Sequence, residues 1–246
     1  MKKIPTLFER DFEDHKVINI RPVLTSPDLQ WVLDGEGEAT VKIDGTCCAV
    51  IDGVFYKRYD AKQGKTPPAD AIPCCDPDPV TGHWPHWVPV KVNDPGSRWH
   101  LEAVRNYHIA NEKPLADGTY EAVGPHFNGN PYDFACDILI RHGIYKIDVP
   151  RSFEGIKEYL RNNEIEGIVF WKDGEPRCKI KRRDFGFEWP VIHHRIEICG
   201  KDQDLYKERH GKILFDENFS RELRSGKIET LTKKSNAKCL VSSAES

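Results

Sequence analysis

The sequence lacks a strong imbalance of charge. Its 36 lysines and arginines nearly offset its 39 aspartates and glutamates, so the formal net charge at pH 7 is −3. Proteins that bind nucleic acid through their overall charge carry a large positive excess. Net charge therefore gives no sign of a nucleic-acid partner, and any such surface must be local.

Long apolar segments are also missing. The opening stretch MKKIPTLFERDFEDHK has no apolar run typical of a secretory signal, and no segment approaches the length that spans a membrane. Hydrophobic residues make up 39% of the chain and charged residues 30%, as in soluble globular proteins. We therefore expect a soluble, intracellular protein of one or two domains, with no membrane partner.

The eight cysteines form no C-x-x-C pair. Four of them occur as the adjacent pairs Cys47-Cys48 and Cys74-Cys75, which are poor zinc ligands and a poor disulfide framework. We expect mostly buried thiols in a reducing compartment, and nothing nearby in the sequence activates Cys47 or Cys48 as a nucleophile. A thiol-rich zinc-binding module remains an alternative that a metal assay would test.

Two β-hairpins are predicted from their turns. TCCAVI and VFYKRY, within residues 38–60, are joined by Asp52-Gly53, and we expect the preceding strand ATVKI to join the same sheet. EIEGIVFW and PRCKIKRRDFG are joined by the turn KDGE. GTYEAVGP predicts another strand, and CDILIRHGIYKID predicts one or two more.

One helix is predicted over residues 151–163, where Ser152 can cap the start and Phe153, Ile156 and Leu160 line one face. Hairpins outnumber helices, and strands do not alternate with helices. The sequence therefore predicts an α+β domain built on antiparallel sheets.

A long stretch between residues 60 and 106 is rich in Pro, Gly and Asp. We expect an excursion with at most short strands, held to the core by Trp84 and Trp87.

The stretch VKIDGT places Lys42 between two β-branched apolar residues. A lysine amine is ordinarily protonated at neutral pH and cannot attack an electrophile. Among other cations in a partly dry cleft it loses its proton more readily and becomes a nucleophile. The plainer interpretation is a surface lysine beside a hairpin turn, because K-x-D-G tetrapeptides also occur by chance.

Three more cations are expected near this lysine. Arg58 lies on the strand paired with the one that follows Lys42, while Lys179 and Lys181 point to one face of their strand. A doubled positive patch suits a triphosphate, and Gly45 permits a turn that approaches a phosphate closely. Alternatively, the basic run over residues 177–183 is a solvated face.

Three acids complete the set. Asp44, Glu121 and Glu166 are candidates to hold Mg²⁺ or Mn²⁺ against the same phosphates, directly or through water. Taken singly, Glu121 and Glu166 also fit solvated carboxylates at strand ends.

The series VKIDGT, YKRYD, GTYEAVGP, EIEGIVFW and RCKIK resembles, in order, motifs I, Ia, III, IV and V of the covalent nucleotidyltransferases. That superfamily comprises DNA ligases, RNA ligases and mRNA-capping guanylyltransferases. More narrowly, KIDGTCC, GHWPHWVPV, FNGNPY, RHG and IEGIVFW resemble the ATP-dependent RNA ligase family that includes vertebrate 5′-3′ RNA ligase 1. The resemblance implies an antiparallel-sheet nucleotidyltransferase (ligase-adenylation, ATP-grasp-like) domain over residues 1–190, with an insert at about 60–106.

The resemblance also implies roles for the matched residues. Lys42 matches the lysine that becomes covalently adenylylated. Asp44 is similar to the acid that orients metal-bound waters. Arg58 matches the arginine near the nucleotide ribose and the incoming 5′-phosphate.

The later motifs supply the rest of this implied site. Glu121 corresponds to the motif III glutamate and Glu166 to the motif IV glutamate associated with metal. Lys179 and Lys181 match the motif V lysines on the α-phosphate. His142 is the candidate ring to stack on adenine, and its alternative is an ordinary turn histidine.

Two departures favour an RNA ligase within the superfamily. Relatives that join DNA or make caps usually have arginine two places after the motif I glycine, where this chain has Cys47. They also carry an OB-fold after motif V, whereas residues 182–246 show no clear run of alternating strands. We expect a short, partly helical extension over residues 191–246 that ends in a frayed tail.

The expected function is therefore an ATP-dependent RNA ligase that joins 5′-phosphate and 3′-hydroxyl ends through a lysyl-AMP intermediate and an adenylylated RNA 5′ end. A DNA ligase, a guanylyltransferase and a non-catalytic RNA-binding relative are the alternatives. Contacts to a 2′-hydroxyl would select RNA. Residues 60–106, Arg182 and Arg183 are candidates for such contacts, or serve only packing and solubility.

Overall fold

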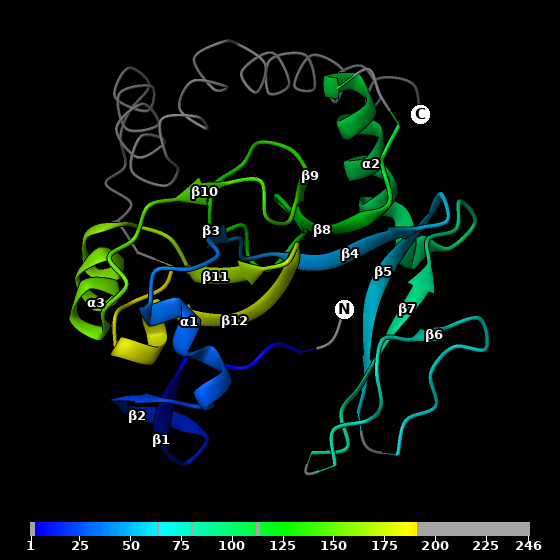
Figure 1. The fold of residues 1–246 in the computed structure, drawn as a ribbon. Helices are drawn as coiled ribbons and strands as arrows, with labels where there is room; N and C mark the ends of the chain where they lie inside the picture. The colour runs from blue at the N-terminus through cyan, green and yellow to red at the C-terminus, as the bar shows by residue number, and fades with distance from the viewer. Residues whose placement is uncertain (1–2, 63, 80, 112–113, 191–246) are drawn as a thin grey trace. The chain divides into compact units, whose positions relative to one another are not determined.

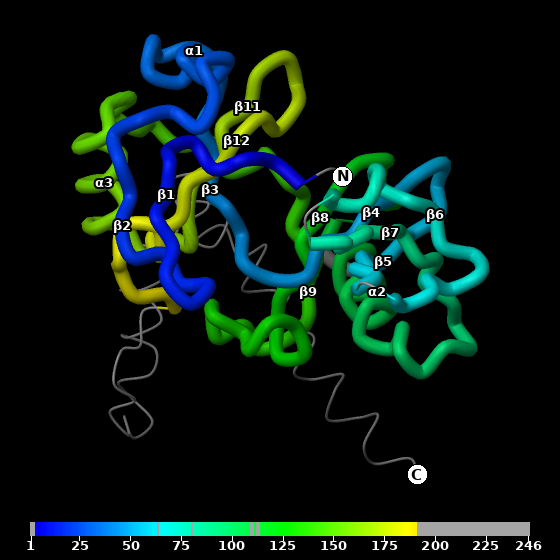
Figure 2. Tube along the Cα trace, turned by 90° about the horizontal axis from the view of Figure 1, so that it is seen from below, coloured from blue at the N-terminus to red at the C-terminus, as the bar shows by residue number. Residues whose placement is uncertain are grey.

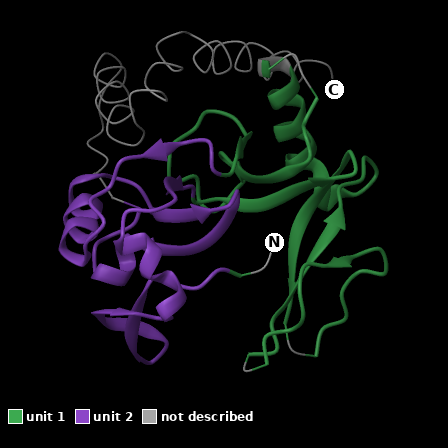
Figure 3. Cartoon of the chain, viewed as in Figure 1, with its two compact units in different colours: residues 1–3, 44–142, 223–246 green, residues 4–43, 143–222 purple. Residues whose placement is uncertain are grey.

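The computed structural model describes residues 3–62, 64–79, 81–111 and 114–190. They fall into two compact units, which Figure 3 shows in separate colours. Unit 1 contains residues 44–142, and unit 2 contains residues 4–43 and 143–190. The chain thus leaves unit 2 after Ile43 and returns to it at Gly143.

Unit 1 is built on a six-stranded antiparallel sheet in the order β6-β7-β5-β4-β8-β9 (Figure 1). Its strands are β4 (Thr46–Ile51), β5 (Val54–Ala61), β6 (Ile72–Pro73), β7 (Trp84–Pro89), β8 (Gly118–Val123) and β9 (Ile138–Arg141). The helix α2 (Arg98–Asn111) follows the 3-10 helix η2 (Pro95–Ser97).

The first predicted hairpin is confirmed as β4 and β5. Its turn residues Asp52 and Gly53 have φ angles of 50° and 72°, the left-handed conformation that a two-residue hairpin turn requires. Both turn N–H groups donate hydrogen bonds to the Asp117 carboxylate. The turn is therefore anchored to the segment that leads into β8.

One face of this sheet packs against α2. Cys48, Val50 and Tyr120 on the sheet join Ala103 of the helix in a buried cluster, with Trp99 against it. Successive strand residues point to opposite faces, so Cys47 and Glu121 lie on the other side of the sheet. This second face carries the polar residues considered below.

The sequence predicts at most short strands over residues 60–106, but α2 begins at Arg98. Near the end of this stretch, Trp99, Ala103 and Tyr107 recur every four residues and pack on the sheet, which is a helical pattern. The sequence alone did not indicate this helix because the stretch as a whole is rich in Pro and Gly. The predicted anchoring by Trp87 is confirmed, because it is 4% exposed in β7.

Unit 2 contains a four-stranded sheet in the order β10-β3-β11-β12 and a two-stranded sheet of β1 and β2. The strands are β1 (Phe8–Glu13), β2 (Lys16–Leu24), β3 (Glu38–Lys42), β10 (Lys146–Ile147), β11 (Gly167–Lys172) and β12 (Glu175–Lys181). Its helices are η1 (Pro27–Leu29), α1 (Gln30–Leu33), α3 (Phe153–Asn162) and η3 (Arg182–Phe185).

The expectation that β3 joins the β4–β5 hairpin is wrong. β3 pairs instead with β10 and β11. Ala39, Thr40 and Val41 are all buried, so both faces of β3 are covered, which suits its central position between β10 and β11. The chain then enters unit 1 at Asp44, before β4 begins.

The predicted helix and second hairpin of unit 2 are confirmed. Ser152 caps α3 by accepting a hydrogen bond from the Gly155 N–H, and Ile156 and Leu160 are fully buried. Figure 2 shows α3 beside β1 and β2, where Phe153 packs edge-on against Phe8 at 5.0 Å. β11 and β12 form the hairpin.

The α+β class with antiparallel sheets is confirmed for the described chain. None of its helices has the length and apolar character needed to cross a membrane. The structure does not describe residues 191–246. The predicted extension with its expected lack of an OB-fold therefore lies outside the described residues, as do Cys199 and Cys239. The predicted domain division at residue 190 stays a prediction.

Candidate functional site

Three charged side chains meet at the ends of adjacent strands in unit 2. Lys42 ends β3, Lys181 ends β12, and both pair with Gly167 at the start of β11. The Nζ atom of Lys42 lies 2.5 Å from Glu166 Oε2, and the Nζ atom of Lys181 lies 2.6 Å from Glu166 Oε1. One carboxylate thus binds two ammonium groups.

This arrangement is built into the protein interior. The Glu166 side chain is 5% exposed, while those of Lys42 and Lys181 are 21% and 34% exposed. A buried carboxylate is costly unless paired, and two cations satisfy both of its oxygens. Gly167 is needed beside it, because a Cβ there would lie 2.3 Å from the Ile180 carbonyl oxygen.

The sequence predicts that Lys42 is surrounded by cations. The structure amends this expectation, because an acid lies between Lys42 and Lys181. Lys179 lies two residues before Lys181 on the same face of β12, while Cys178 and Ile180 are buried on the other. The backbone of Lys179 is paired with the segment at Pro5 and Leu7. The predicted alternation along CKIK is therefore confirmed.

In unit 1, Glu121 and His142 are joined on the sheet face away from α2. His142 Nε2 lies 2.8 Å from Glu121 Oε2, and His142 Nδ1 lies 2.9 Å from Thr119 Oγ1. The other carboxylate oxygen of Glu121 accepts a hydrogen bond from the Gly45 N–H at 3.1 Å. Stacking of His142 on adenine stays a prediction, and the structure shows its ring held by hydrogen bonds at both nitrogens.

Gly45 has a different role from the expected tight turn. A Cβ at this position would lie 2.3 Å from the Ala122 carbonyl oxygen and 2.6 Å from Val123 Cγ1. Glycine therefore lets the backbone pass close to β8, where its N–H reaches Glu121. Approach to a phosphate stays a prediction.

Asp44 is held by two residues that sequence reasoning treated only as turn chemistry. Its Oδ1 accepts a hydrogen bond from Asn128 Nδ2 at 2.7 Å, and its backbone N–H donates to the Tyr132 hydroxyl at 2.6 Å. Both partners come from the segment HFNGNPYD. In the sequence, the polar residues of this turn were the available signal for a functional segment. The contact of these residues with Asp44 is visible only in the fold.

Arg58 lies on the same face as Glu121. The register that pairs Cys48 with Lys57 places Arg58 opposite Cys47 one step further along the hairpin. Burial opposes the charge of Arg58, but its hydrogen bond to Asp60 at 2.7 Å and the negative charge of Asp60 act together against this, so the pKa of Arg58 is raised above its ordinary value. Arg58 therefore stays charged.

Cys47 lies opposite Glu121 across β4 and β8. Burial, reinforced by the negative charge of Glu121, raises the pKa of the Cys47 thiol to about 12. The thiolate is the reactive form of cysteine, so this thiol is unreactive at neutral pH. The finding agrees with the interpretation of Cys47 as an unactivated thiol.

The carboxylates fit a hard divalent cation to different degrees. Asp44 and Glu121 belong to unit 1, and Gly45, which follows Asp44, binds Glu121 directly. Carboxylate oxygens are the ligands that Mg²⁺ prefers. Glu166 has both oxygens engaged by lysines, and Glu121 has its oxygens engaged by the Gly45 N–H and by His142, so each would have to release a partner to bind a metal directly.

Comparison with known proteins agrees with the motifs. The chain matches the RNA ligase 1 family over residues 109–200, which include Glu121, His142, Glu166, Lys179 and Lys181. It is 26% identical to RNA ligase 1 of Danio rerio, with 84% of this chain and 91% of that protein covered. Identity to RNA ligase 1 of Pongo abelii is 28%, and to that of Rattus norvegicus 27%, with 62% of this chain and 68% of each relative covered. These matches confirm the predicted resemblance to the RNA ligase 1 family.

Proposed function

We propose that this chain, a relative of the RNA ligase 1 family, is an ATP-dependent RNA ligase that joins 5′-phosphate and 3′-hydroxyl ends of RNA. The observation that carries the proposal is the carboxylate of Glu166 shared by Lys42 and Lys181. It holds one amine that can act as a nucleophile beside a second cation that can neutralise phosphate charge. The family match supplies the kind of reaction.

In the first step the Nζ atom of Lys42 attacks the α-phosphorus of ATP. A nitrogen–phosphorus bond forms, the bond from the α-phosphorus to the bridging oxygen breaks, and pyrophosphate leaves. The ammonium must lose two protons overall. The first passes to Glu166 Oε2, which already lies 2.5 Å away, and the second leaves with pyrophosphate or to water.

Transfer of this proton neutralises the Glu166 carboxylate. Lys181 then loses its charged partner, and its ammonium becomes available to the oxygens on phosphorus as negative charge gathers there. Glu166 therefore couples activation of the nucleophile to release of the stabilising cation. Lys179, on the same strand face, is the second lysine proposed for the α-phosphate.

Asp44 and Glu121 are the residues that would hold Mg²⁺ directly or through water. When bound, Mg²⁺ supplies positive charge that stabilises the phosphates. Two hydrogen bonds orient these carboxylates: Asn128 donates to Asp44, and the Gly45 N–H donates to Glu121. Arg58 and His142 are the proposed further contacts to the nucleotide.

Two further transfers complete the cycle. The 5′-phosphate of RNA displaces Lys42 from the adenylate, which forms a 5′-5′ pyrophosphate and returns the amine. A 3′-hydroxyl then attacks the RNA phosphate, AMP leaves and the phosphodiester forms. Each displacement conserves the energy of the anhydride until the final bond is made.

The test is transfer of label from ATP radioactive at the α-phosphorus to the purified protein with Mg²⁺. Label should be retained after denaturation in the native chain and absent in Lys42→Arg, which keeps the positive charge. Addition of 5′-phosphorylated single-stranded RNA should discharge the label and yield ligated RNA. Covalent label that persists at wild-type level in Lys42→Arg would remove Lys42 from its role.

The alternatives give different outcomes in the same assay. Labelling from GTP instead of ATP would indicate capping chemistry. Equal joining of matched DNA would indicate a DNA ligase. Binding of RNA without any covalent label would indicate a non-catalytic relative, and each of these results would overturn the proposal.

A further inference from the structure

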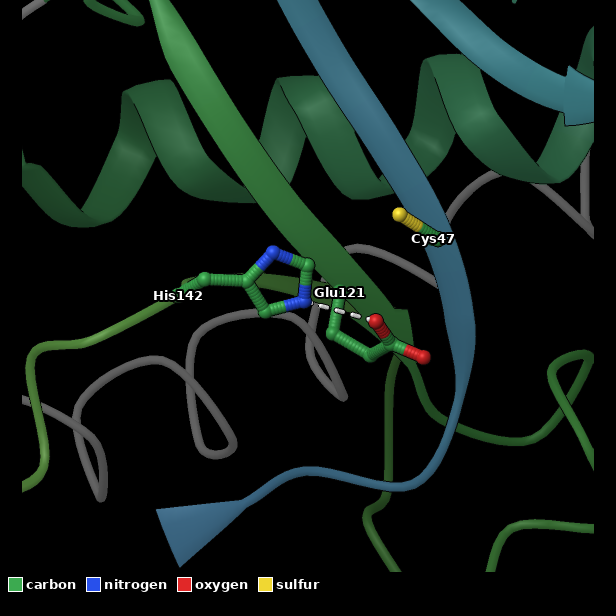
Figure 4. Close-up of side chains that lie close together, drawn as sticks. All are labelled: Cys47, Glu121 and His142. Carbon is green, nitrogen blue, oxygen red and sulfur yellow. Dashed lines mark hydrogen bonds and ion pairs between the residues drawn. The ribbon is translucent and has the colours of Figure 1, made fainter. Parts of the chain in front are cut away.

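Cys47, Glu121 and His142 form a compact group of potential metal ligands in unit 1. One ligand atom from each lies within 4.8 Å of the other two (Figure 4). Cys47 and Glu121 are partners across β4 and β8, and His142 directly follows β9. Strand register therefore brings together a sulfur, an oxygen and a nitrogen ligand that lie far apart in the sequence.

We propose that this cluster binds Zn²⁺ or a transition-metal ion of similar chemistry through Cys47 Sγ, Glu121 Oε2 and His142 Nε2. Thiolate, imidazole and carboxylate are the protein ligands of zinc, and sites with three protein ligands keep a fourth position for water or another molecule. Sulfur and nitrogen select Zn²⁺ over Mg²⁺, which prefers oxygen alone.

The geometry requires only a small contraction. Zinc bonds of about 2.0–2.3 Å in a tetrahedron place ligand atoms roughly 3.3–3.7 Å apart. His142 Nε2 and Glu121 Oε2 are already 2.8 Å apart and would separate slightly. All three ligand atoms lie within 4.8 Å of one another, so the Cys47 sulfur needs to approach the other two by no more than the difference between this distance and the tetrahedral spacing.

Neighbouring groups already orient the two other ligands as metal sites require. Thr119 Oγ1 lies 2.9 Å from His142 Nδ1, so it can accept the Nδ1–H and leave the Nε2 lone pair for the metal. The Gly45 N–H holds Glu121 Oε1, which leaves Oε2 on the side of the imidazole. Metal binding at Nε2 would leave the single imidazole proton on Nδ1, where Thr119 Oγ1 accepts it, and the thiol proton would go to solvent.

The charges of the site favour a cation there. A thiol must ionise to bind a metal, and Cys47 lies directly opposite the Glu121 carboxylate across β4 and β8. Arg58, on the strand next to Cys47, forms an ion pair with Asp60 at 2.7 Å. A divalent ion supplies the charge that two anionic ligands need.

Occupancy by zinc would oppose adenylylation. Glu121 and His142 are residues that the proposed function assigns to ATP and Mg²⁺, and a bound zinc ion would engage both. This consequence rests on the proposed function, but metal binding itself does not. Cys47 has no part in the proposed reaction, so its substitution tests zinc binding separately from the proposed function.

The direct test is titration of the purified full chain with Zn²⁺ against a chromogenic chelator, without ATP or RNA. Cys47→Ser should raise the Kd for Zn²⁺ about tenfold or more, whereas Cys75→Ser, a matched exchange at a half-buried thiol, should leave it unchanged. Co²⁺ bound to the native chain should show a thiolate-to-cobalt charge-transfer band that Cys47→Ser loses. Circular dichroism confirms that both variants are folded.

The same variants test inhibition. Zn²⁺ should suppress labelling from ATP in the native chain and in Cys75→Ser, and about tenfold more Zn²⁺ should be needed in Cys47→Ser, whose basal labelling is unchanged. Zinc affinity that is unaffected by Cys47→Ser, or a cobalt complex without a thiolate band that depends on Cys47, would overturn the site. Absence of labelling in every variant would instead count against the proposed function and leave the zinc titration to decide the site.

Discussion

Lys42 and Lys181 bind opposite oxygens of the same Glu166 carboxylate, at 2.5 Å and 2.6 Å. Both lysines are the register partners of Gly167, so the backbone of β11 sets their separation. The arrangement depends on strand pairing that joins segments over 120 residues apart, because Lys42 and Glu166 are separated by 124 positions. A single substitution at Glu166 therefore affects the nucleophile and its neighbouring cation together.

Glu166→Gln should slow formation of lysyl-AMP by about 100-fold or more, since the amide cannot accept the Lys42 proton as a carboxylate does. It should also lower the free energy of unfolding by about 1–3 kcal/mol, because two partly buried ammonium groups lose their charged partner. Single-turnover labelling and urea unfolding measure the two effects. Glu175→Gln, at an exposed position of the same hairpin, is the control and should change neither. A full labelling rate in Glu166→Gln would exclude the carboxylate as proton acceptor.

Gly45→Ala should destabilise unit 1 by about 3 kcal/mol, because the new methyl group collides with the Ala122 carbonyl and the Val123 side chain at 2.3 Å and 2.6 Å. The backbone must then move away from β8, which breaks the hydrogen bond from Gly45 to Glu121. Thermal unfolding measures the loss. Gly96→Ala is the matched exchange, since the atoms nearest its Cβ would be the ends of two side chains, Asp94 at 3.3 Å and Lys57 at 3.4 Å, and not backbone atoms. Equal melting temperatures for the two variants would show that the close approach is not required.

Asn128→Ala should raise the Mg²⁺ concentration needed for half-maximal labelling by about tenfold, with little change in stability. Asn128 donates to Asp44 Oδ1 at 2.7 Å, and its loss lets the carboxylate rotate away from the position that the metal needs. Asn93 is exposed, so Asn93→Ala is the control and should leave the Mg²⁺ requirement unchanged. An unchanged Mg²⁺ requirement, with a lowered maximal rate, would mean that Asn128 acts on the nucleotide instead.

Local patterns predicted the elements, and distant pairings decided the site. Asp52-Gly53 and Ser152 marked a hairpin and a helix start from neighbouring residues alone, and both are confirmed. The alternation of Lys179 and Lys181 followed from strand geometry. Such signals extend over a few residues, so they do not show which strands become neighbours.

The wrong pairing predicted for β3 and the contacts that the sequence did not reveal both arise because local patterns do not show which strands become neighbours. β3 follows the pattern of a strand wherever it pairs, so its sequence did not show that β10 and β11 would flank it. The contact of Asn128 with Asp44 spans 84 positions. The grouping of Cys47 with His142 likewise depends on the order of β4, β8 and β9 in the sheet. The motif resemblance supplied candidate residues, and the fold supplied their partners.

We expect His100 to make the stability of the protein depend on pH, separately from the candidate site. Both ring nitrogens are buried, and neither is hydrogen-bonded to any residue that the structure describes. Its ring lies edge-on to Phe127 at 5.0 Å. Burial, followed by the charge of Lys57 and opposed by Asp94, lowers the pKa of His100 from 6.5 to about 4.

The sign follows from the folded pKa lying below the unfolded one. As the pH falls below about 6.5, His100 binds a proton in the unfolded chain but not in the folded one. The free energy of unfolding therefore decreases until about pH 4, by up to about 3 kcal/mol. His100→Leu removes this proton uptake. Urea unfolding at pH 7.5, 6 and 5 should therefore show the variant gaining stability relative to the native chain as the pH is lowered. A constant difference between the two proteins across this range would show that His100 is protonated as easily in the folded state as in the unfolded one.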